Sequence, residues 1–324
     1  MKALVCQAFG PLEDLVVKDV PDPTPGPGQV VVRVQTASVN YPDALTVLGR
    51  YQFKPNLPFT PGHEIAGQVL AVGEGVKHLA PGATVAGMAS LGAFAEQVVL
   101  DARSAMPLDP GIDPALAACL PTTYGTMHHA LTDRARLKAG ETLLVLGAGG
   151  GVGTASIELG KIIGATVIAA ASSAEKLQAA QGCGADHLID YTKEDLRERL
   201  KQITGGKGVD VVVDPVGGPY SELALRSTAW NGRFLVIGFA AGEIPKIPLN
   251  LALLKGCSIV GVFWGDFMKR EPRRGAQELA ELAGWLKAGR LRPVVSARYP
   301  LTDAVAALKH VFERRAIGKV LIQP

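Results

Sequence analysis

The chain has 324 residues, of which 48% are hydrophobic and 19% are charged. This length exceeds what one hydrophobic core usually holds, so two domains are expected. The formal net charge of +3 gives no electrostatic argument for nucleic acid or a membrane surface as a partner. The four cysteines, Cys6, Cys119, Cys183 and Cys257, lie far apart without a CxxC pair. The sequence therefore suggests neither a zinc cluster nor a disulfide framework.

The N-terminal stretch MKALVCQAFG is typical of a strand rather than of a signal peptide, and no apolar run is long enough to span a bilayer. We expect a reducing cytoplasm as the compartment. In residues 1–120, short Val-rich runs at 30–34, 68–72 and 84–86 are separated by turns rich in Gly and Pro. Many short strands joined in this way favour a compact antiparallel barrel.

The centre of the chain, residues 142–164, has the sequence TLLVLGAGGGVGTASIELGKIIG. It predicts a buried strand at 143–146, a glycine turn, and a helix whose apolar stripe ends before Gly164. Counted from Ala148, the turn has the pattern Ala148-x-Gly150-x-x-Gly153 of a dinucleotide fingerprint. Such a turn lets the backbone approach a pyrophosphate, and the helix N-terminus offers free N–H groups. The alternative is a glycine-rich helix entry without a ligand, but a second strand and helix follow at 166–170 and 174–181.

Strand and helix alternate from residue 121 to about 258, which predicts a doubly wound parallel sheet of the Rossmann type. The expected strands are 143–146, 166–170, 187–189, 209–214, 234–237 and 258–262. Residues 263–324 predict two helices, 276–288 and 304–313, and two strands, 297–300 and 319–322, which return to the first domain. The expected organisation is therefore 1–122, 123–262 and 263–324.

Four segments together carry a family resemblance: SVNYPDALTVLGRY at 38–51, TPGHEIAGQVLAVGEGV at 60–76, AGGGVG at 148–153 and GKVLI at 318–322. They resemble the zinc-free quinone oxidoreductases (zeta-crystallin-like) of the medium-chain dehydrogenase/reductase superfamily, and residues 225–265 look particularly like the quinone oxidoreductase-like protein 2 subgroup. The resemblance implies an α/β fold with a GroES-like β-barrel catalytic domain and a Rossmann domain. It also implies hydride transfer from NADPH to a quinone or related conjugated carbonyl.

The resemblance places the acceptor among Asn40, Tyr41, Asp43 and Tyr51. Enoyl thioester reductases of the superfamily have a proton-donating tyrosine where Tyr51 stands; the alternative role for Tyr51 is an aromatic wall. On the cofactor side the implied residues are Thr126, Gly238, Phe239, Ala240, Ala241 and Phe263 for the nicotinamide, Ala148, Gly150, Gly151, Val152 and Gly153 for the pyrophosphate, Ser172, Ser173 and Lys176 for the 2′-phosphate, Tyr191 for the adenine, and Lys319 for the phosphates.

NADPH is expected over NADH because residues 169–171 are all alanine, where NAD-specific folds carry an Asp or Glu. Lys176 is otherwise an ordinary surface lysine. Ser172-x-x-Glu175 also predicts a capping box at the start of the helix. His128 and His129 are expected in packing or at the surface.

No metal is expected. The zinc alcohol dehydrogenases have a lobe of four closely spaced cysteines that this chain lacks. Their catalytic metal uses a cysteine where this chain has residues 40–43, a second where Ala118 stands, and a His corresponding to His63. Cys119 is one residue out of place. His63 and Glu64 thus have no thiolate partners, and a hydrogen-bonded turn is the simpler role for them.

Three alternatives stay open. They are a zinc alcohol dehydrogenase, an enone, alkenal or enoyl-thioester reductase, and a catalytically idle, crystallin-like NADPH-binding protein. The expected partners are a small-molecule quinone or enone and a second copy of the chain, because the last strands and residues 249–254 are strongly apolar.

Overall fold

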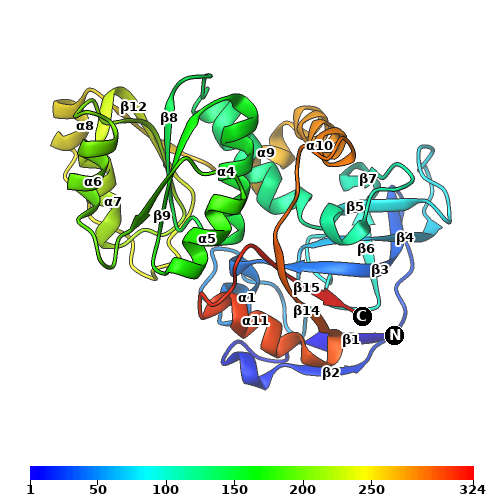
Figure 1. Cartoon of the computed structure of the whole chain (residues 1–324). Coiled ribbons are helices and arrows are strands. Elements are labelled where there is room, and N and C mark those ends of the chain that lie inside the picture. Colours follow the sequence, from blue (N-terminus) through cyan, green and yellow to red (C-terminus); the bar gives the residue numbers. More distant parts are fainter. The chain divides into compact units, whose positions relative to one another are not determined.

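The computed structural model describes residues 1–324, which form two compact units. The first unit contains Met1–Thr122 and Met268–Pro324, and the second contains Thr123–Phe267. The C-terminal tail thus belongs to the first unit (Figure 1). The boundary between the second unit and this tail lies after Phe267, within helix α9 (Trp264–Arg270), whereas the sequence predicted it after residue 262.

The second unit is a six-stranded parallel sheet with the order β10-β9-β8-β11-β12-β13, the doubly wound order expected of a Rossmann fold. Its strands are β8 (Thr142–Leu146), β9 (Thr166–Ala171), β10 (His187–Asp190), β11 (Val209–Asp214), β12 (Thr228–Val236) and β13 (Ser258–Gly261). Besides α9, its helices are α3 (Gly125–His129), α4 (Gly151–Ile163), α5 (Ala174–Gly182), α6 (Leu196–Ile203), α7 (Pro219–Arg226) and α8 (Asn250–Lys255). Helices α4 and α5 lie on one side of this sheet, and α6 and α7 on the other (Figure 1).

The first unit is organised around β3 (Gln29–Val39), the longest strand. Its sheet has the order β14-β15-β3-β4-β5-β7, and β6 also pairs with β3. All of these pairs are antiparallel except β14–β15, which is parallel. The other strands are β1 (Lys2–Val5) and β2 (Val16–Asp19), which form a separate ribbon, and β4 (Glu64–Val72), β5 (Thr84–Met88), β6 (Gln97–Asp101), β7 (Ala105–Pro107), β14 (Val295–Pro300) and β15 (Lys319–Gln323). The helices are α1 (Tyr41–Val47), α2 (Pro114–Ala117), α10 (Pro272–Lys287) and α11 (Ala304–Phe312).

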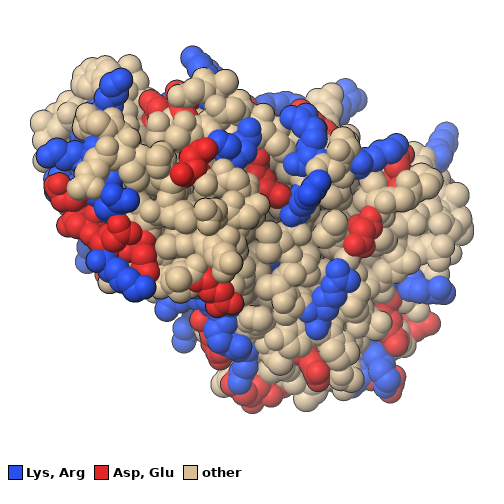
Figure 2. Space-filling view, viewed as in Figure 1, with Lys and Arg blue, Asp and Glu red and all other residues tan.

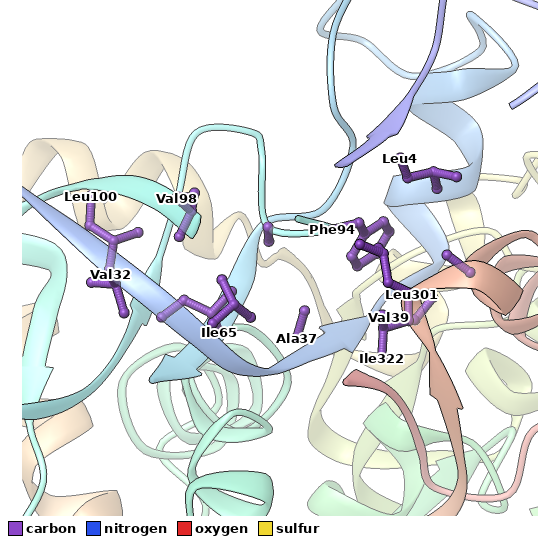
Figure 3. Close-up of a cluster of buried hydrophobic side chains, with 14 of the residues drawn as sticks. Leu4, Val32, Ala37, Val39, Ile65, Phe94, Val98, Leu100, Leu301 and Ile322 are labelled. Carbon is purple, nitrogen blue, oxygen red and sulfur yellow. The ribbon is translucent and has the colours of Figure 1, made fainter. Parts of the chain in front are cut away.

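The core of the first unit joins residues that are far apart in the sequence. Val32, Ala37 and Val39 of β3 lie in one buried cluster with Leu301 and with Ile322 of the last strand (Figure 3). Burial of these apolar side chains fixes the C-terminal strand beside β3. Lys319, at the start of β15, is thereby held close to the end of β3 and the start of α1.

Charges of both signs alternate over the face drawn in Figure 2, between wide areas without charge. This pattern agrees with the small formal net charge of +3. None of the helices combines the length and the apolar composition that crossing a membrane requires.

Candidate active site

The first functional cluster lies where β3 ends and α1 begins. Asn40 precedes α1, and its backbone N–H donates to Asp43 Oδ2 at 2.7 Å. The carboxylate of Asp43, in the first turn of the helix, thus satisfies an N–H that the helix itself leaves unpaired. The side chain of Asp43 is completely buried. Of the residues assigned to the acceptor, Asn40 and Asp43 are therefore brought together.

A buried ion pair extends this cluster to β4 and β15. Lys319 Nζ lies 2.9 Å from Glu64 Oε1, 2.7 Å from Asn40 Oδ1 and 3.4 Å from the Val39 carbonyl. Asn40 Nδ2 donates to the same Glu64 oxygen at 2.8 Å, and the Thr122 N–H donates to Glu64 Oε2 at 2.8 Å. Both charges are buried, so each requires the other.

Lys319 thus lies in the polar network of the first unit, whereas the resemblance assigned it to the cofactor phosphates. Its ammonium group makes three bonds to oxygens of this unit, and the contact with the phosphates stays a prediction. The physical reason for these bonds is Glu64, whose side chain is fully buried and whose charge is costly without a partner. A sequence pattern does not reveal such a pair, because the two residues are far apart along the chain.

His63 joins the cluster through Asp43. Its Nδ1 lies 2.5 Å from Asp43 Oδ1, and its side chain is 22% exposed. Burial alone would lower the pKa of His63. The hydrogen bond and the charge of Asp43, together with the charge of Glu64, outweigh burial and raise this pKa above its ordinary value.

The two tyrosines of the predicted acceptor region behave differently. Tyr51 is partly buried, and burial together with the charge of Asp43 raises the pKa of its phenol. The charge of Asp43 thus acts on Tyr51 as well as on His63. Tyr41 stacks on Phe312, with ring centroids 5.6 Å apart and planes inclined by 22°. This contact gives Tyr41 a packing role between α1 and α11.

In the second unit, the glycine turn after β8 is built as the fingerprint requires. Gly147 turns the chain with a φ of +61°, and Gly150 immediately precedes α4. A Cβ on Gly153 would lie 2.4 Å from the Gly147 carbonyl oxygen, so helix and turn approach as closely as a third fingerprint glycine allows. A Cβ on Gly150 would meet nothing nearer than 3.6 Å, so the fold itself does not require glycine there. The predicted end of the helix is confirmed, because Gly164 caps α4 with a φ of 95°.

The next loop brings Ser173 and Lys176 to the same edge of the sheet. Ser173 is the N-cap of α5, and its Oγ accepts the Lys176 N–H at 3.4 Å. The predicted capping box beginning at Ser172 is therefore wrong by one residue. The side chain of Lys176 crosses the glycine turn: a Cβ on Gly149 would lie 2.5 Å from Lys176 Cβ. The absence of a side chain at Gly149 thus lets the stem of Lys176 lie on the turn.

Sequence reasoning missed Asp214, which organises two further loops at this edge. Its Oδ1 accepts the N–H groups of Val216 and Gly217 at 2.9 Å each, and its Oδ2 accepts from Ser221 Oγ at 2.5 Å. The loop held in this way supports residues 238–241, because its carbonyls at Pro215 and Val216 accept the N–H groups of residues 240 and 241. An acid at the end of a Val-rich strand, followed by Pro-Val-Gly-Gly, was the available signal.

The remaining predicted cofactor residues also belong to the second unit. Tyr191 follows β10 and packs on Tyr220, which the sequence did not indicate, with ring centroids 4.2 Å apart. Thr126 lies on α3, the helix that packs on α4. Phe263 is 57% exposed, whereas the neighbouring Trp264 is buried. His128 and His129 are buried, as expected of packing residues.

Comparisons with known proteins agree on a family. Residues 26–110 match the family model of the alcohol dehydrogenase GroES-like domain, and residues 151–283 match that of the zinc-binding dehydrogenases. The chain is 38% identical over 325 residues to the quinone oxidoreductase-like protein 2 homolog of Nematostella vectensis, covering 99% of this chain and 88% of that protein.

Solved structures extend the similarity to the whole chain. Escherichia coli quinone oxidoreductase complexed with NADPH is 29% identical, with a TM-score of 0.93 and coverage of 100% of both chains. A mycobacterial protein complexed with NADPH is also 29% identical, with a TM-score of 0.94 and the same coverage.

The name of one matching family raises the question of zinc, and the residues present do not fit it. No group of three or more His, Cys, Asp or Glu side chains is arranged to hold a metal ion. Cys119 is buried, its Sγ faces the Ala115 carbonyl, and burial raises the pKa of its thiol to about 12. A thiol with that pKa does not readily supply the thiolate that zinc binds. His63 and Glu64 are engaged by Asp43 and Lys319.

The fold, the glycine turn and these similarities lead to one conclusion. The chain belongs to the quinone oxidoreductase family of the medium-chain dehydrogenase/reductase superfamily, with a GroES-like domain and a Rossmann domain, and is an oxidoreductase that uses a nicotinamide cofactor.

Proposed function

We propose that the protein is a zinc-independent reductase that transfers a hydride from NADPH to a quinone or a related conjugated carbonyl. The observation that carries this proposal is the strand edge of the second unit. There the glycine turn, Ser173 and Lys176 lie side by side, and the adjoining strand β9 ends in three alanines without an acid. This set suits a dinucleotide that carries an additional 2′-phosphate.

The residues proposed to hold NADPH come from the loops at this edge. Residues 148, 150–153 and the N-terminus of α4 suit the pyrophosphate. The N–H groups of Ala148 and Gly150 donate to the carbonyls of Ala170 and Gly147 and so shape the turn. The first N–H groups of α4 have no partner within the helix, and α4 is long enough to have a useful dipole. Ser172, Ser173 and Lys176 suit the 2′-phosphate, and Tyr191 the adenine. Residues 238–241, held by the Asp214 loop, suit the nicotinamide together with Thr126 and Phe263. The relatives that carry NADPH support this choice over NADH.

The cofactor supplies the hydride; the residues of the first unit are proposed to hold the acceptor. Asn40 and Tyr51 are proposed to face the acceptor, and the buried Asp43 is proposed to hold this part of the site in place through its bonds to the Asn40 N–H and to His63. Asn40 is also fixed by Lys319 and Glu64. The oxyanion formed when a quinone accepts a hydride is stabilised by its own aromatic ring. Positioning and hydrogen bonds to the oxygen are therefore sufficient catalysis, without a metal.

A screen of acceptors tests the proposal. We expect NADPH oxidation with 9,10-phenanthrenequinone or another o-quinone to exceed that with 2-alkenals and enoyl-CoA. Faster turnover of alkenals or enoyl thioesters would favour the corresponding reductase. Tight NADPH binding without turnover of any acceptor would favour an idle binding protein.

The four free cysteines suit a reducing compartment such as the cytoplasm.

We propose further that two copies of the chain associate through β13. This strand ends the parallel sheet, with a partner strand on one side only, and such an edge invites pairing. Nearby, Trp230 and Leu253 are 74% and 79% exposed. An isologous pairing would cover this apolar surface. Light scattering should give a dimer mass that Leu253→Glu reduces and the control Leu57→Glu does not; a monomer at all concentrations would remove the proposal.

A further inference from the structure

His63 differs from the other members of its polar network because one ring nitrogen is unused. Nδ1 is bonded to the buried Asp43 at 2.5 Å, whereas Nε2 has no hydrogen-bond partner in the protein. The ring is 22% exposed although the Asp43 side chain is fully buried. One nitrogen therefore anchors the ring, and the other can reach a ligand.

The backbone of His63 is held as firmly as its ring. Gly62 precedes it with a φ of +96°, and a Cβ there would lie 2.6 Å from the ring of Phe94. On the other side, the Ala89 N–H donates to the His63 carbonyl at 2.7 Å. Asp43 is itself fixed by the Asn40 N–H. The turn at Gly62 and the bond to Asp43 thus hold the free nitrogen in a defined place.

Two acidic groups act on the imidazole, and a lysine is bonded to one of them. Asp43 on α1 is in direct contact, and Glu64 on β4 adds a second negative charge. Lys319 on β15 is bonded to Glu64 and offsets part of that charge. Tyr51 lies within the field of the same Asp43. The hydrogen bond to the Asp43 carboxylate favours the doubly protonated imidazole, in which both nitrogens are donors.

We propose that His63 is the general acid of the reaction and donates its Nε2 proton to the oxygen of the acceptor after hydride transfer. This inference rests on the proposed function. The Nε2–H bond breaks, its electron pair stays on Nε2, and an O–H bond forms on the acceptor, whose two added electrons arrive with the hydride. His63 is left neutral, its Nδ1–H still bonded to Asp43, and takes a new proton from water. Asp43 is a positioning residue.

One matching family is named for zinc binding, but the side chains around His63 do not form a zinc site. This difference leaves His63 open to another role. A carboxylate that orients an imidazole also occurs behind metal-ligating histidines. Here the thiolates that would complete such a site are lacking, so the second nitrogen is available for a proton. General acid catalysis contributes about 10²–10⁴-fold where the anion formed is strongly basic. The enolate from a 2-alkenal is such an anion, whereas the anion of a reduced quinone is stabilised.

His63→Asn is the variant that tests the proposal. Its side-chain amide keeps an N–H donor for Asp43, so the buried carboxylate is not orphaned, but it has no titrating nitrogen. We expect wild-type kcat to fall as the pH rises through the pKa of His63, because the protonated form is the active one. We call this fall of kcat with rising pH the alkaline limb, and it should disappear in His63→Asn. At pH 7, kcat of this variant should fall more than tenfold with a 2-alkenal and less than threefold with an o-quinone.

Three companions make the outcome decisive. Asp43→Asn should move the limb to lower pH, because the charge that favours the protonated ring is gone, and Tyr51→Phe should retain it. The control His187→Asn replaces an exposed histidine of the second unit and should leave the profile unchanged. All variants are compared by melting temperature and after EDTA treatment.

The proposal is overturned if the limb survives in His63→Asn with whichever acceptor is turned over, if the wild type shows no limb, or if EDTA removes the rate, which would make His63 a metal ligand. Failure of the proposed function is seen separately, as wild-type enzyme that oxidises no NADPH with any acceptor.

Discussion

The preference for NADPH should depend on one side chain, Lys176. Its stem lies against the glycine turn at Gly149, and its backbone is fixed by the N-cap at Ser173. The ammonium therefore starts from an anchored stem rather than from a free surface chain. A charge-assisted contact with a phosphate contributes about 1.5–3 kcal/mol. Since 1.4 kcal/mol corresponds to a factor of ten, Lys176→Ala should raise the Kd for NADPH about 10- to 150-fold.

The same variant should barely change the Kd for NADH, which lacks the 2′-phosphate. Titration calorimetry with both cofactors measures the two values, and Lys176→Arg should recover part of the loss. Lys207→Ala, which removes the same charge from an exposed loop of the second unit, serves as the matched control. Raising the salt concentration should weaken NADPH binding to the wild type more than to Lys176→Ala. Equal losses for NADPH and NADH would refute the assignment of Lys176 to the 2′-phosphate.

Three further outcomes are expected. Gly153→Ala forces a methyl to 2.4 Å from a backbone oxygen and should cost about 1–3 kcal/mol of stability. Gly150→Ala should instead fold normally but bind NADPH more weakly. Calorimetric melting and binding curves separate the two effects, and normal NADPH binding by Gly150→Ala would contradict the pyrophosphate site. With an o-quinone, Tyr51→Phe should raise KM more than it lowers kcat, and a hundredfold loss in kcat would instead favour an enoyl or enone reductase. Burial would raise the pKa of Glu141, but its hydrogen bonds with Arg233 outweigh burial and lower this pKa. The ion pair therefore stabilises the fold above the ordinary pKa of Glu141, and this stabilisation is lost as the pH falls through the lowered pKa. Urea unfolding of Arg233→Met should show that the free energy of unfolding falls by about 1.5–3 kcal/mol at pH 7 and by less at pH 3, and an equal loss at both pH values would exclude the ion pair as its cause.

The sequence was most informative where structure is local. The strand, the glycine turn and the α4 stripe lie within about one βα unit, and each piece follows from short-range patterns. Gly164 ends the helix as expected, because a helix C-terminus commonly needs one residue in the left-handed conformation and glycine adopts it without strain. The cap of α5 was placed one residue early, since Ser172 and Ser173 are both good N-cap residues and only the backbone shows which one is used.

The polar network of the first unit could not be predicted in the same way. Lys319 and Glu64 meet only because β15 pairs with β3, and β3 pairs with β4. No local pattern contains that information, and a lysine near the C-terminus has many other uses. His63 and Asp43 were both noted, but their contact also required the turn at Gly62 and the cap at Asn40. The resemblance supplied residue roles; the folded chain supplied their partners.

The central claim is hydride transfer from NADPH to a conjugated carbonyl without a metal. The most direct measurement is the rate of NADPH oxidation with 9,10-phenanthrenequinone, recorded together with the zinc content of the same EDTA-treated preparation. We expect full activity at a zinc content far below one per chain, and no gain when zinc is added back. Activity that rises and falls in proportion to one zinc per chain would contradict the account.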